Sequence, residues 1–350
     1  MEKGRHRPFY ILLTLILVLI AGAVQAGPRY TIAVVQHQQF LPFQQAHDAF
    51  ISNLSILGNK ADFDIVDDFN ARSDIGALES KINELAARSD IDLIFTIGTH
   101  STKRMVKAEK KTPIVYTIVG DPQNAGIVKD WKSSGANYTG VETPEYYTKV
   151  VRLMHHFVSF KSLGMIYLKG SPSHEAGIRQ IRKLSKEIGF KFIHEGFPLR
   201  DENRVRFPRD QIRSNMQSAL AAVCPRVDAF FVQTSNTFTK EFDVFMAAFL
   251  EHRIVSAGDP TNIQKGLVMG IGKDAERFGR QCAQYAVKIL EGTPPAALPM
   301  DVGVKLSVDV NLKAAELVGF EPPFELISGA DNLYQNVAST DLAEAGATNR

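Results

Sequence analysis

Two stretches of the chain, residues 92–124 and 228–262, present their polar residues in the same order. Each begins with an aspartate before an apolar run, turns through small hydroxylic residues, passes into a helical pattern and ends at Gly-Asp-Pro-x-Asn. At the hydroxylic turns, backbone N–H groups and hydroxyls could receive a carboxylate or another hydrogen-bond acceptor. The same residues could instead only cap the helices that follow. The predicted chemistry is the binding of a small polar molecule, at turns formed by Gly98, Thr99, His100 and Ser101 and by Thr234, Ser235, Asn236 and Thr237.

An aspartate precedes the proline of each Gly-Asp-Pro signal, Asp121 in the first stretch and Asp259 in the second. The residue before a proline is biased towards extended backbone, which places each carboxylate at the exit of a strand. There the carboxylate could hold a cationic group of a ligand or fix its own turn, and the sequence leaves both alternatives open.

The sequence lacks the common catalytic and metal-binding motifs. Gly-x-Ser-x-Gly, His-Glu-x-x-His and the Walker lysine motif are all missing. His37, His100 and His174 fall in predicted loops and could converge, although loop histidines are more often ordinary hydrogen-bonding groups than metal ligands. Residues 270–275 match Gly-x-Gly-x-x-Ala, but they come near the end of the chain instead of at the first strand-to-helix turn. We therefore expect no enzyme activity, no metal and no cofactor.

Aromatic side chains near the predicted loops could hold a planar ligand between them. The candidates are Phe40, Phe43, Tyr116, Tyr146 and Phe238. Phe43 and Phe238 are more typical of a core, whereas Phe40 falls in the loop after the first predicted strand. Phe40 is our first choice for a stacking residue, and its loop neighbour Gln38 is a further candidate for ligand contact.

A polar run over residues 200–209 holds four arginines. Acidic residues are interspersed with them, which dilutes the positive charge. We interpret this run as a solvated face in preference to an anion site.

The alternation of strands and helices predicts where these residues lie. Such alternation requires right-handed crossovers and a parallel sheet, with ligands bound beyond the carboxyl ends of the strands. The pattern runs from residue 30 to about 141 and starts again near residue 146, which predicts two similar α/β lobes. The predicted strands are 30–35, 63–67, 93–97, 163–168, 191–196, 229–233, 267–271 and 302–310, and the predicted helices include 73–88, 147–157, 175–189 with Ser173 as its cap, 211–223, 274–290 and 311–318.

The composition is that of an ordinary globular protein. The 350 residues are 45% hydrophobic and 22% charged, with a formal net charge of +2, and the length suggests about two domains. Removing the basic N-terminal segment leaves a chain close to neutral, which argues against nucleic acid as a partner. Cys224 and Cys282 are far apart in sequence and are more typical of two buried thiols than of a disulfide.

The N-terminus has the order of a secretory signal peptide. Basic residues in the first eight positions precede an apolar run over 9–20, and small residues lead to a cleavage point after Ala26. An uncleaved membrane anchor is the alternative, but the apolar run is shorter than the ~20 residues that a span usually needs. We expect residues 1–26 to be removed and the mature chain to be exported to the periplasm.

Several segments, taken together and in order, resemble a known family. They are DLIFTIGTHSTKRM, TPIVYTIVGDPQNAGIV, NYTGVET, GSPSHEAG, DAFFVQTSNT, GLVMGIGKDAERFGRQCAQYAVKILEG and VNLKAAELVGF. The chain is similar along most of its mature length to the ABC-transporter substrate-binding proteins related to tryptophan/tyrosine-type periplasmic binding proteins. The resemblance implies a type I periplasmic-binding fold, in which two Rossmann-like lobes with parallel sheets are joined by a multi-segment hinge. The expected boundaries are 28–140 plus 273–295 for the first lobe, 141–272 plus 296–325 for the second lobe, and 335–350 for a disordered tail.

The resemblance also implies a set of ligand-facing residues. By position these are Gly98, Thr99, Asp121, Ser173, His174, Glu175, Thr234, Ser235, Asn236 and Asp259. One departure matters: the family often has Asp-Asn where this chain has Ser235-Asn236, so a carboxylate that could pair with an amino group is lost. A polar or aromatic solute other than an α-amino acid thereby becomes a candidate.

The function implied is that of a non-enzymatic, monomeric solute-binding protein. It would close on a small molecule, an amino acid or related metabolite, and deliver it to the membrane permease of an ABC importer. Two alternatives remain open, a ligand sensor of a signalling system with the same fold and, with less support, a cofactor-using enzyme built on residues 270–275.

Overall fold

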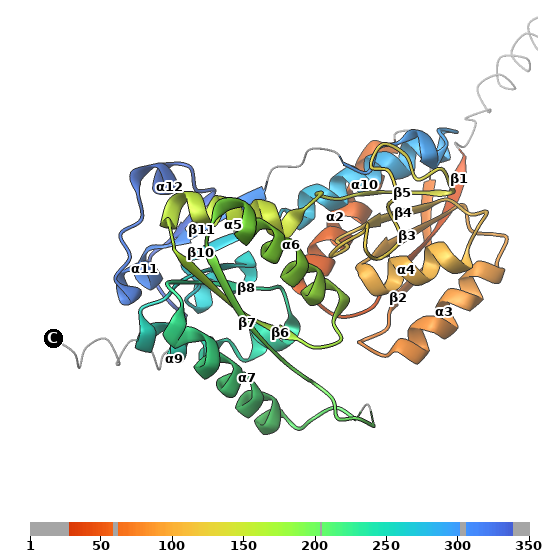
Figure 1. Ribbon diagram of the computed structural model, residues 1–350. Coiled ribbons are helices and arrows are strands. Elements are labelled where there is room, and N and C mark those ends of the chain that lie inside the picture. Colours follow the sequence, from red (N-terminus) through yellow and green to blue (C-terminus); the bar gives the residue numbers. More distant parts are fainter. Residues whose placement is uncertain (1–27, 59–61, 204, 302–305, 339–350) are drawn as a thin grey trace, which may run out of the picture.

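The computed structural model describes residues 28–58, 62–203, 205–301 and 306–338, which form two α/β lobes beside each other (Figure 1). The expected signal peptide, residues 1–26, lies outside the described residues. None of the helices in the described ranges combines the length and the apolar character needed to cross a bilayer.

The first lobe is built on five parallel strands in the order β2-β1-β3-β4-β5. Alternate residues of β1 face opposite sides, so that Ile32 and Val34 pack on one helix layer while Ala33 and Val35 pack on the other. Helices α2 and α10 cover one face, and α3 and α4 cover the other. The elements are β1 Arg29–Gln36, α2 Leu41–Leu57, β2 Asp62–Asn70, α3 Ile75–Ala87, β3 Leu93–Ile97, α4 Thr99–Ala108, β4 Ile114–Thr117, β5 Tyr138–Val141 and α10 Ala275–Leu290.

The second lobe repeats this order and extends it. Its strands run β12-β11-β10-β9-β8-β6-β7, so the five from β7 to β10 match the order of the first lobe. Among the described strands, β10 and β11 form the only antiparallel pair, and β12 runs parallel to β11. The predicted α/β fold with two parallel sheets is thereby confirmed. The elements are α5 Tyr146–Val158, β6 Ser162–Leu168, α6 Pro172–Ile188, β7 Lys191–Phe197, α7 Arg209–Val223, β8 Ala229–Val232, α8 Asn236–Lys240, α9 Phe242–His252, β9 Val255–Gly258, β10 Met269–Lys273, β11 Leu306–Asn311, α11 Leu312–Val318, α12 Phe324–Ser328 and β12 Asn332–Tyr334, with short 3-10 turns at Cys224–Arg226, Pro260–Lys265 and Pro295–Ala297.

Helix α10 returns from the second lobe to pack beside α2 in the first (Figure 1). A Cβ added to Gly279 would lie 2.2 Å from the carbonyl oxygen of Ala46, so the two backbones approach more closely than any side chain permits. Cys282, on the same helix, is buried and free, as is Cys224 in the core of the other lobe.

The chain passes between the lobes after β5, after β10 and again before β11. Leu298 and Met300 still pack in first-lobe clusters, and the backbone N–H of Glu142 donates to the carbonyl of Met300. The first lobe therefore extends beyond residue 295, where we expected it to end. The second lobe extends beyond residue 325, because β12 pairs with β11.

The first part of the expected tail is attached to the second lobe. Val337 packs against the core of that lobe, and the N–H of Ala338 donates to the carbonyl of Gln264. The expectation of a disordered tail from residue 335 is therefore incorrect for residues 335–338, and residues 339–350 lie outside the described ranges.

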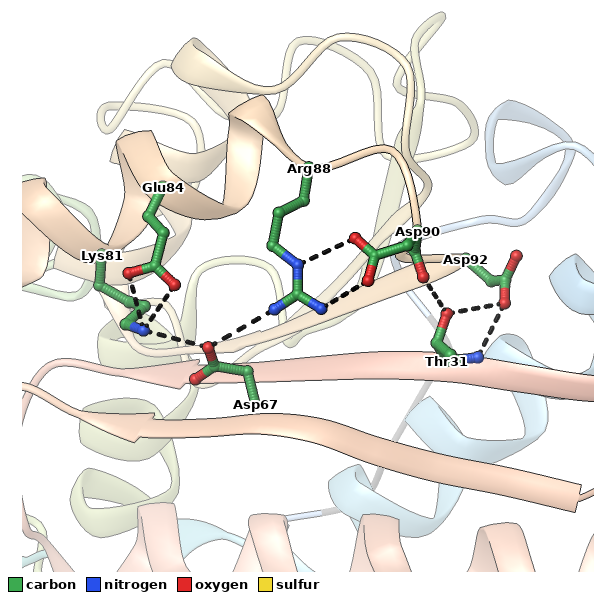
Figure 2. A network of polar contacts seen from close by, with 7 residues as sticks. All are labelled: Thr31, Asp67, Lys81, Glu84, Arg88, Asp90 and Asp92. Atoms are coloured by element: carbon green, nitrogen blue, oxygen red, sulfur yellow. Dashed lines mark hydrogen bonds and ion pairs between the residues drawn. The ribbon is translucent and has the colours of Figure 1, made fainter.

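A polar network fixes α3 and the loop after it to the edge of the first sheet (Figure 2). Asp67 on β2 pairs with Lys81 at 3.1 Å and with Arg88 at 3.9 Å, and Arg88 pairs in turn with Asp90 at 2.8 Å. The side chain of Asp92 then accepts the backbone N–H of Thr31 at 2.7 Å. The second lobe has an equivalent of this last contact, in which Asp228 accepts from the backbone of the residues that open β6. The aspartate that begins each repeated stretch is thus a structural residue that holds the first strand of its own lobe.

Candidate functional site

The repeated turns meet at a cavity between the lobes. Each hydroxylic turn follows the third strand of its lobe, β3 or β8, and each Gly-Asp-Pro follows the fourth, β4 or β9. Within each lobe the two turns are bonded, since Thr99 Oγ1 accepts from the N–H of Gly120 at 3.0 Å and Thr234 Oγ1 donates to Asp259 Oδ2 at 2.7 Å. The cavity encloses about 750 Å³ and is lined from both lobes.

The structure brings together all of the predicted site residues except Asp121 and Glu175. Those that line the cavity are Gln38, Phe40, Gly98, Thr99, His100, Ser173, His174, Thr234, Ser235, Asn236 and Asp259. Asp121 instead accepts from the backbone and side-chain amides of Asn124, and Glu175 accepts from the N–H of Gly170 at 3.0 Å. These two carboxylates shape their loops without lining the cavity.

Asp259 both lines the cavity and fixes its own turn. Its Oδ1 accepts from the N–H and the hydroxyl of Thr261, at 3.0 and 2.7 Å, while its Oδ2 accepts from Thr234. Both carboxylate oxygens are therefore bonded within the second lobe, and the group gives the cavity a rigid negative charge next to the hinge.

Contacts across the cavity show that the lobes are closed on one another. Asn236 Nδ2 in the second lobe donates to the carbonyl of Gln39 in the first at 2.8 Å. Arg179 on α6 lies 3.9 Å from Asp121. A Cβ added to Gly120 would lie 2.6 Å from the Cβ of Ser173, so the backbone of the first lobe at Gly120 packs directly against the start of α6.

Helix α6 begins earlier than expected. Pro172 occupies its first turn, where a fixed φ and a missing N–H are both favourable, and Ser171 is the N-cap residue. The expected cap, Ser173, therefore lies inside the helix, and its side chain faces the cavity.

Two histidines form part of the first-lobe wall. The rings of His37 and His100 lie 4.6 Å apart between centroids. Burial, and then the nearby His100 and Arg104, lower the pKa of His37 to about 4. Burial and Arg104 likewise lower the pKa of His100. Both rings are neutral near pH 7, and the buried Nε2 of His37 has no hydrogen-bond partner among the described residues, which leaves it available to a ligand.

His174 has a different task, because both of its ring nitrogens are occupied. Nδ1 accepts from the N–H of Leu168 at 3.0 Å, which leaves Nε2 to donate to the carbonyl of Thr234 at 3.2 Å. Burial lowers the pKa of this side chain to about 4. His174 thus joins α6, β6 and the turn after β8 and holds the second-lobe wall in place.

A buried ion pair lies where two hinge segments meet. Lys273, at the end of β10, pairs with Glu142, which follows β5 and is fully buried. Glu142 also accepts from the N–H of Val119, and Lys273 Nζ donates to the carbonyl of Val119 at 3.1 Å. Burial raises the pKa of Glu142, and the lysine opposes that rise. The pair fixes the loop that leads to Gly120, and Lys273 itself lines the cavity.

The aromatic lining differs in part from our expectation. Phe40, Phe43 and Tyr146 line the cavity, whereas Tyr116 and Phe238 are fully buried in the cores. Phe43 also belongs to the first-lobe core, where it packs beneath Gly98. Tyr147, whose pKa is raised by burial, contributes a further ring that the sequence analysis missed. Its position could be recognised only once the start of α5 was placed at the hinge.

Basic residues form a second group that the sequence analysis missed. Lys169, Arg200, Arg206 and Lys240 line the cavity at its second-lobe side. We interpreted the run that contains Arg200 and Arg206 as a solvated face. The structure places those two residues on the cavity wall, because the loop after β7 lies at the carboxyl end of the sheet like the other ligand loops.

The site as a whole is equipped for binding. It offers neutral imidazoles, hydroxyls, aromatic rings and cationic side chains on two lobes. No cluster of three or more His, Cys, Asp or Glu side chains suited to a metal occurs among residues 28–58, 62–203, 205–301 and 306–338.

Comparison with known proteins agrees with this architecture. The tyrosine-binding protein of Clostridioides difficile is 23% identical over 292 residues, which cover 82% of this chain and 81% of that protein. A structure described as an ABC domain from Streptococcus pneumoniae in complex with L-Trp is 20% identical with a TM-score of 0.72, covering 87% of this chain and 99% of that one. The ligand-free, open structure of a substrate-binding protein with adhesive properties from Clostridium difficile is 22% identical with a TM-score of 0.68, covering 88% and 100%.

More distant solute-binding proteins share the same architecture, with TM-scores of 0.59 and 0.53 for proteins bound to 5-methylthioribose and myo-inositol. The fold is the type I periplasmic-binding fold that the resemblance implied. The profile of the family described as ABC transporter substrate binding protein matches residues 31–333, nearly the whole of the described chain. The protein therefore belongs to the ABC transporter substrate-binding protein family.

Proposed function

We propose that the protein is the extracytoplasmic solute-binding component of an ABC importer. It captures a small polar or aromatic solute, an amino acid or a related metabolite, by closure of its two lobes, and it presents the closed form to a membrane permease. Residues 1–26 would direct export and be removed, and the mature chain would act as a monomer.

The observation that carries this proposal is the hydrogen bond from Asn236 to Gln39 across a cavity lined by both lobes. A bond of this kind exists only when the lobes are closed. A ligand that contacts both walls therefore stabilises the closed state in preference to the open one. The names of two relatives, one tyrosine-binding and one bound to L-Trp, support an aromatic amino acid or a compound like it.

The lining supports a ligand with both polar and aromatic parts. The side chains of Phe40, Tyr146 and Tyr147 supply faces for stacking, and the hydroxylic turns and His37 supply hydrogen bonds. Ser235 stands where the family often has a carboxylate, so the positive charge of a ligand's α-amino group has no carboxylate partner at this position. We therefore include solutes that lack an amino group among the candidates.

Thermal unfolding against a panel of L-amino acids, their deaminated analogues and small metabolites tests the proposal. A ligand at about 100 times its Kd stabilises the folded state by about 2.7 kcal/mol, which is readily seen as a rise in Tm. The variant Ser173→Trp fills the cavity from α6 and should abolish the rise. The variant Lys186→Trp, on the exposed face of the same helix, should keep it. A folded protein whose Tm responds to no member of the panel would overturn the proposal.

A further inference from the structure

The cavity extends from the hinge side of the two lobes to their far side. The strands that lead into the hinge, β5 and β10, lie at one side, and the outermost strands on the opposite side are β2 and β7. Lining residues come from the hinge, such as Lys273 and Ala275, and also from the loop after β2, with Ser73 and Ile75. The loop after β7 contributes Leu199 and Arg206 on the other lobe. The site thus has an inner part at the hinge and an outer part between these two loops.

The volume of the cavity is that of a site for a drug-sized ligand. Pockets that enclose drug-sized ligands measure about 300–1,000 Å³, and this one encloses about 750 Å³. A compact solute bound at the hydroxylic turns would leave the outer part unfilled.

The charge of the lining is strongly asymmetric. Asp259 is the only acidic residue among those that line the cavity, whereas Lys169, Arg200, Arg206, Lys240 and Lys273 are basic. The formal net charge of the whole chain is only +2, so this local excess does not follow from composition. Lys273 is neutralised by Glu142 at the hinge, which leaves the positive charge concentrated in the outer part.

Three of the outer cations, those other than Arg200, have no carboxylate partner among the described residues. Lys169, Arg206 and Lys240 form no ion pair with a carboxylate in the described part of the chain. Two acidic residues close to these cations in sequence, Glu241 and Asp201, are engaged elsewhere. Glu241, next to Lys240, is held by Arg209 at 2.8 Å and by Arg213 at 2.6 Å.

Asp201 is likewise occupied, because it accepts the N–H of Val205 at 2.8 Å and so closes the loop that carries Arg206. The carboxylate of Asp201 is therefore bonded to the backbone of the loop, while Arg206 lines the cavity. A cationic surface with low-dielectric walls concentrates anions and accelerates their capture.

We propose that the ligand is an extended anionic solute, whose carboxylate or phosphate lies in the outer part of the cavity against Lys240, Arg206 and Lys169. This inference rests on the proposed function and adds the ligand's charge and length to it. The guanidinium of Arg206 can bind a carboxylate or a phosphate with two parallel hydrogen bonds, and the two lysines act as point charges beside it. The remainder of the ligand would reach inwards to the hydroxylic turns and the aromatic rings.

Two matched pairs of probes test the inference and distinguish the two anions. O-phospho-L-tyrosine is compared with L-tyrosine, and L-glutamyl-L-tyrosine with L-glutaminyl-L-tyrosine, by isothermal titration calorimetry on the mature chain. We expect the anionic member of at least one pair to bind about tenfold or more tightly than its neutral partner. Its affinity should also weaken as ionic strength rises, whereas that of the neutral partner should not.

The double variant Arg206→Gln/Lys240→Gln should lose the preference for the anion and keep the affinity for the neutral member. Lys191→Gln removes an exposed cation from the opposite, amino end of β7 and should behave as the wild type. The inference is overturned if neither anionic probe binds more tightly than its neutral partner, or if the preference survives in the double variant. Binding of neutral solutes without any anion preference would leave the proposed function intact, whereas a lack of binding by every solute would overturn both.

Discussion

Lys273 and Glu142 lie 131 positions apart in sequence and form a buried ion pair at the hinge. Breaking a buried pair by removing one partner costs about 3–5 kcal/mol, because the remaining charge is left uncompensated. We expect Lys273→Met to lower the free energy of unfolding by about this amount in urea denaturation at pH 7.

The loss of unfolding free energy in Lys273→Met should increase as pH rises. Burial already raises the pKa of Glu142, and without Lys273, which lowers it, the folded-state pKa should lie further above that of the unfolded chain. Such a group stabilises the fold below its unfolded pKa and loses that contribution as pH rises. Lys273→Met should therefore approach wild-type stability near pH 4.5 and fall behind it towards pH 8. The double variant Glu142→Gln/Lys273→Met should be less destabilised than the sum of the two single variants, and strict additivity would contradict the buried-pair interpretation.

Asn236→Ala tests the bond that joins the lobes. The bond to the carbonyl of Gln39 contributes to the closed state alone, so its loss should weaken ligand binding without lowering the Tm of the ligand-free chain. A net contribution of about 0.5–1.5 kcal/mol corresponds to roughly two- to tenfold in Kd, mainly through faster dissociation. Stopped-flow displacement measures the rate. Asn215→Ala, which removes the acceptor of a hydrogen bond from Gln211 within α7, is the matched control, and an equal effect in both variants would contradict a role in closure.

His174 predicts a loss of stability in mild acid. Its folded pKa is about 4 against about 6.5 when unfolded, so the neutral ring stabilises the fold above pH 6.5, and this contribution is lost as pH falls towards 4. The full difference is on the order of 3 kcal/mol. In urea titrations from pH 7.5 to 4.5, the gap between wild type and His174→Gln should narrow steadily. The exposed His156→Gln should follow the wild type throughout, and a constant gap for His174→Gln would show that the ring titrates normally.

The hydrophobic pattern of short segments predicted individual strands and the turns that follow them. β3 has the predicted bounds, and Thr99 and Thr234 line the cavity because the turns after parallel strands share one edge. Whether the aspartates of the two repeats are structural or ligand-binding residues was harder to predict. Asp92 and Asp228 head both repeats, yet the structure uses them to hold strands, a role that has no distinctive sequence signature.

The residues that sequence reasoning missed depend on contacts between distant segments. Arg206 becomes a cavity residue only when the loop after β7 is placed opposite the loop after β2. Lys273 directly precedes the helix predicted over 274–290, and its role could not be recognised there because its partner Glu142 lies in another crossing of the hinge. No local pattern encodes such a pairing, since it is determined by the way the two lobes are joined.

Ser235 is where we expect the preference for amines to be decided. Its hydroxyl accepts from the N–H of Thr237 at 3.2 Å and lines the cavity, so an aspartate could keep the cap and add a negative charge. We expect Ser235→Asp to favour L-tyrosine over 3-(4-hydroxyphenyl)propanoate by about 1.5–3 kcal/mol more than the wild type does, measured by calorimetry. Ser235→Asn keeps the cap without the charge and should show no such change. Equal behaviour of the two variants would place the ligand's amino group elsewhere.

Gly120 tests the closeness of the two lobes. A methyl group at this position would lie 2.6 Å from the Cβ of Ser173, and α6 belongs to the opposite lobe. The lobes can separate to relieve the clash, so Gly120→Ala should fold normally but populate the open state and bind ligand at least about tenfold more weakly. Small-angle scattering should show that saturating ligand contracts the wild type and contracts the variant less. Adding Ser173→Gly to Gly120→Ala removes the opposing Cβ and should restore part of the ligand affinity. The control is Gly76→Ala, whose added Cβ makes only an ordinary 3.4 Å contact within the first lobe and should leave the ligand affinity unchanged. A Gly120→Ala variant that contracts and binds like the wild type would show that this contact does not limit closure.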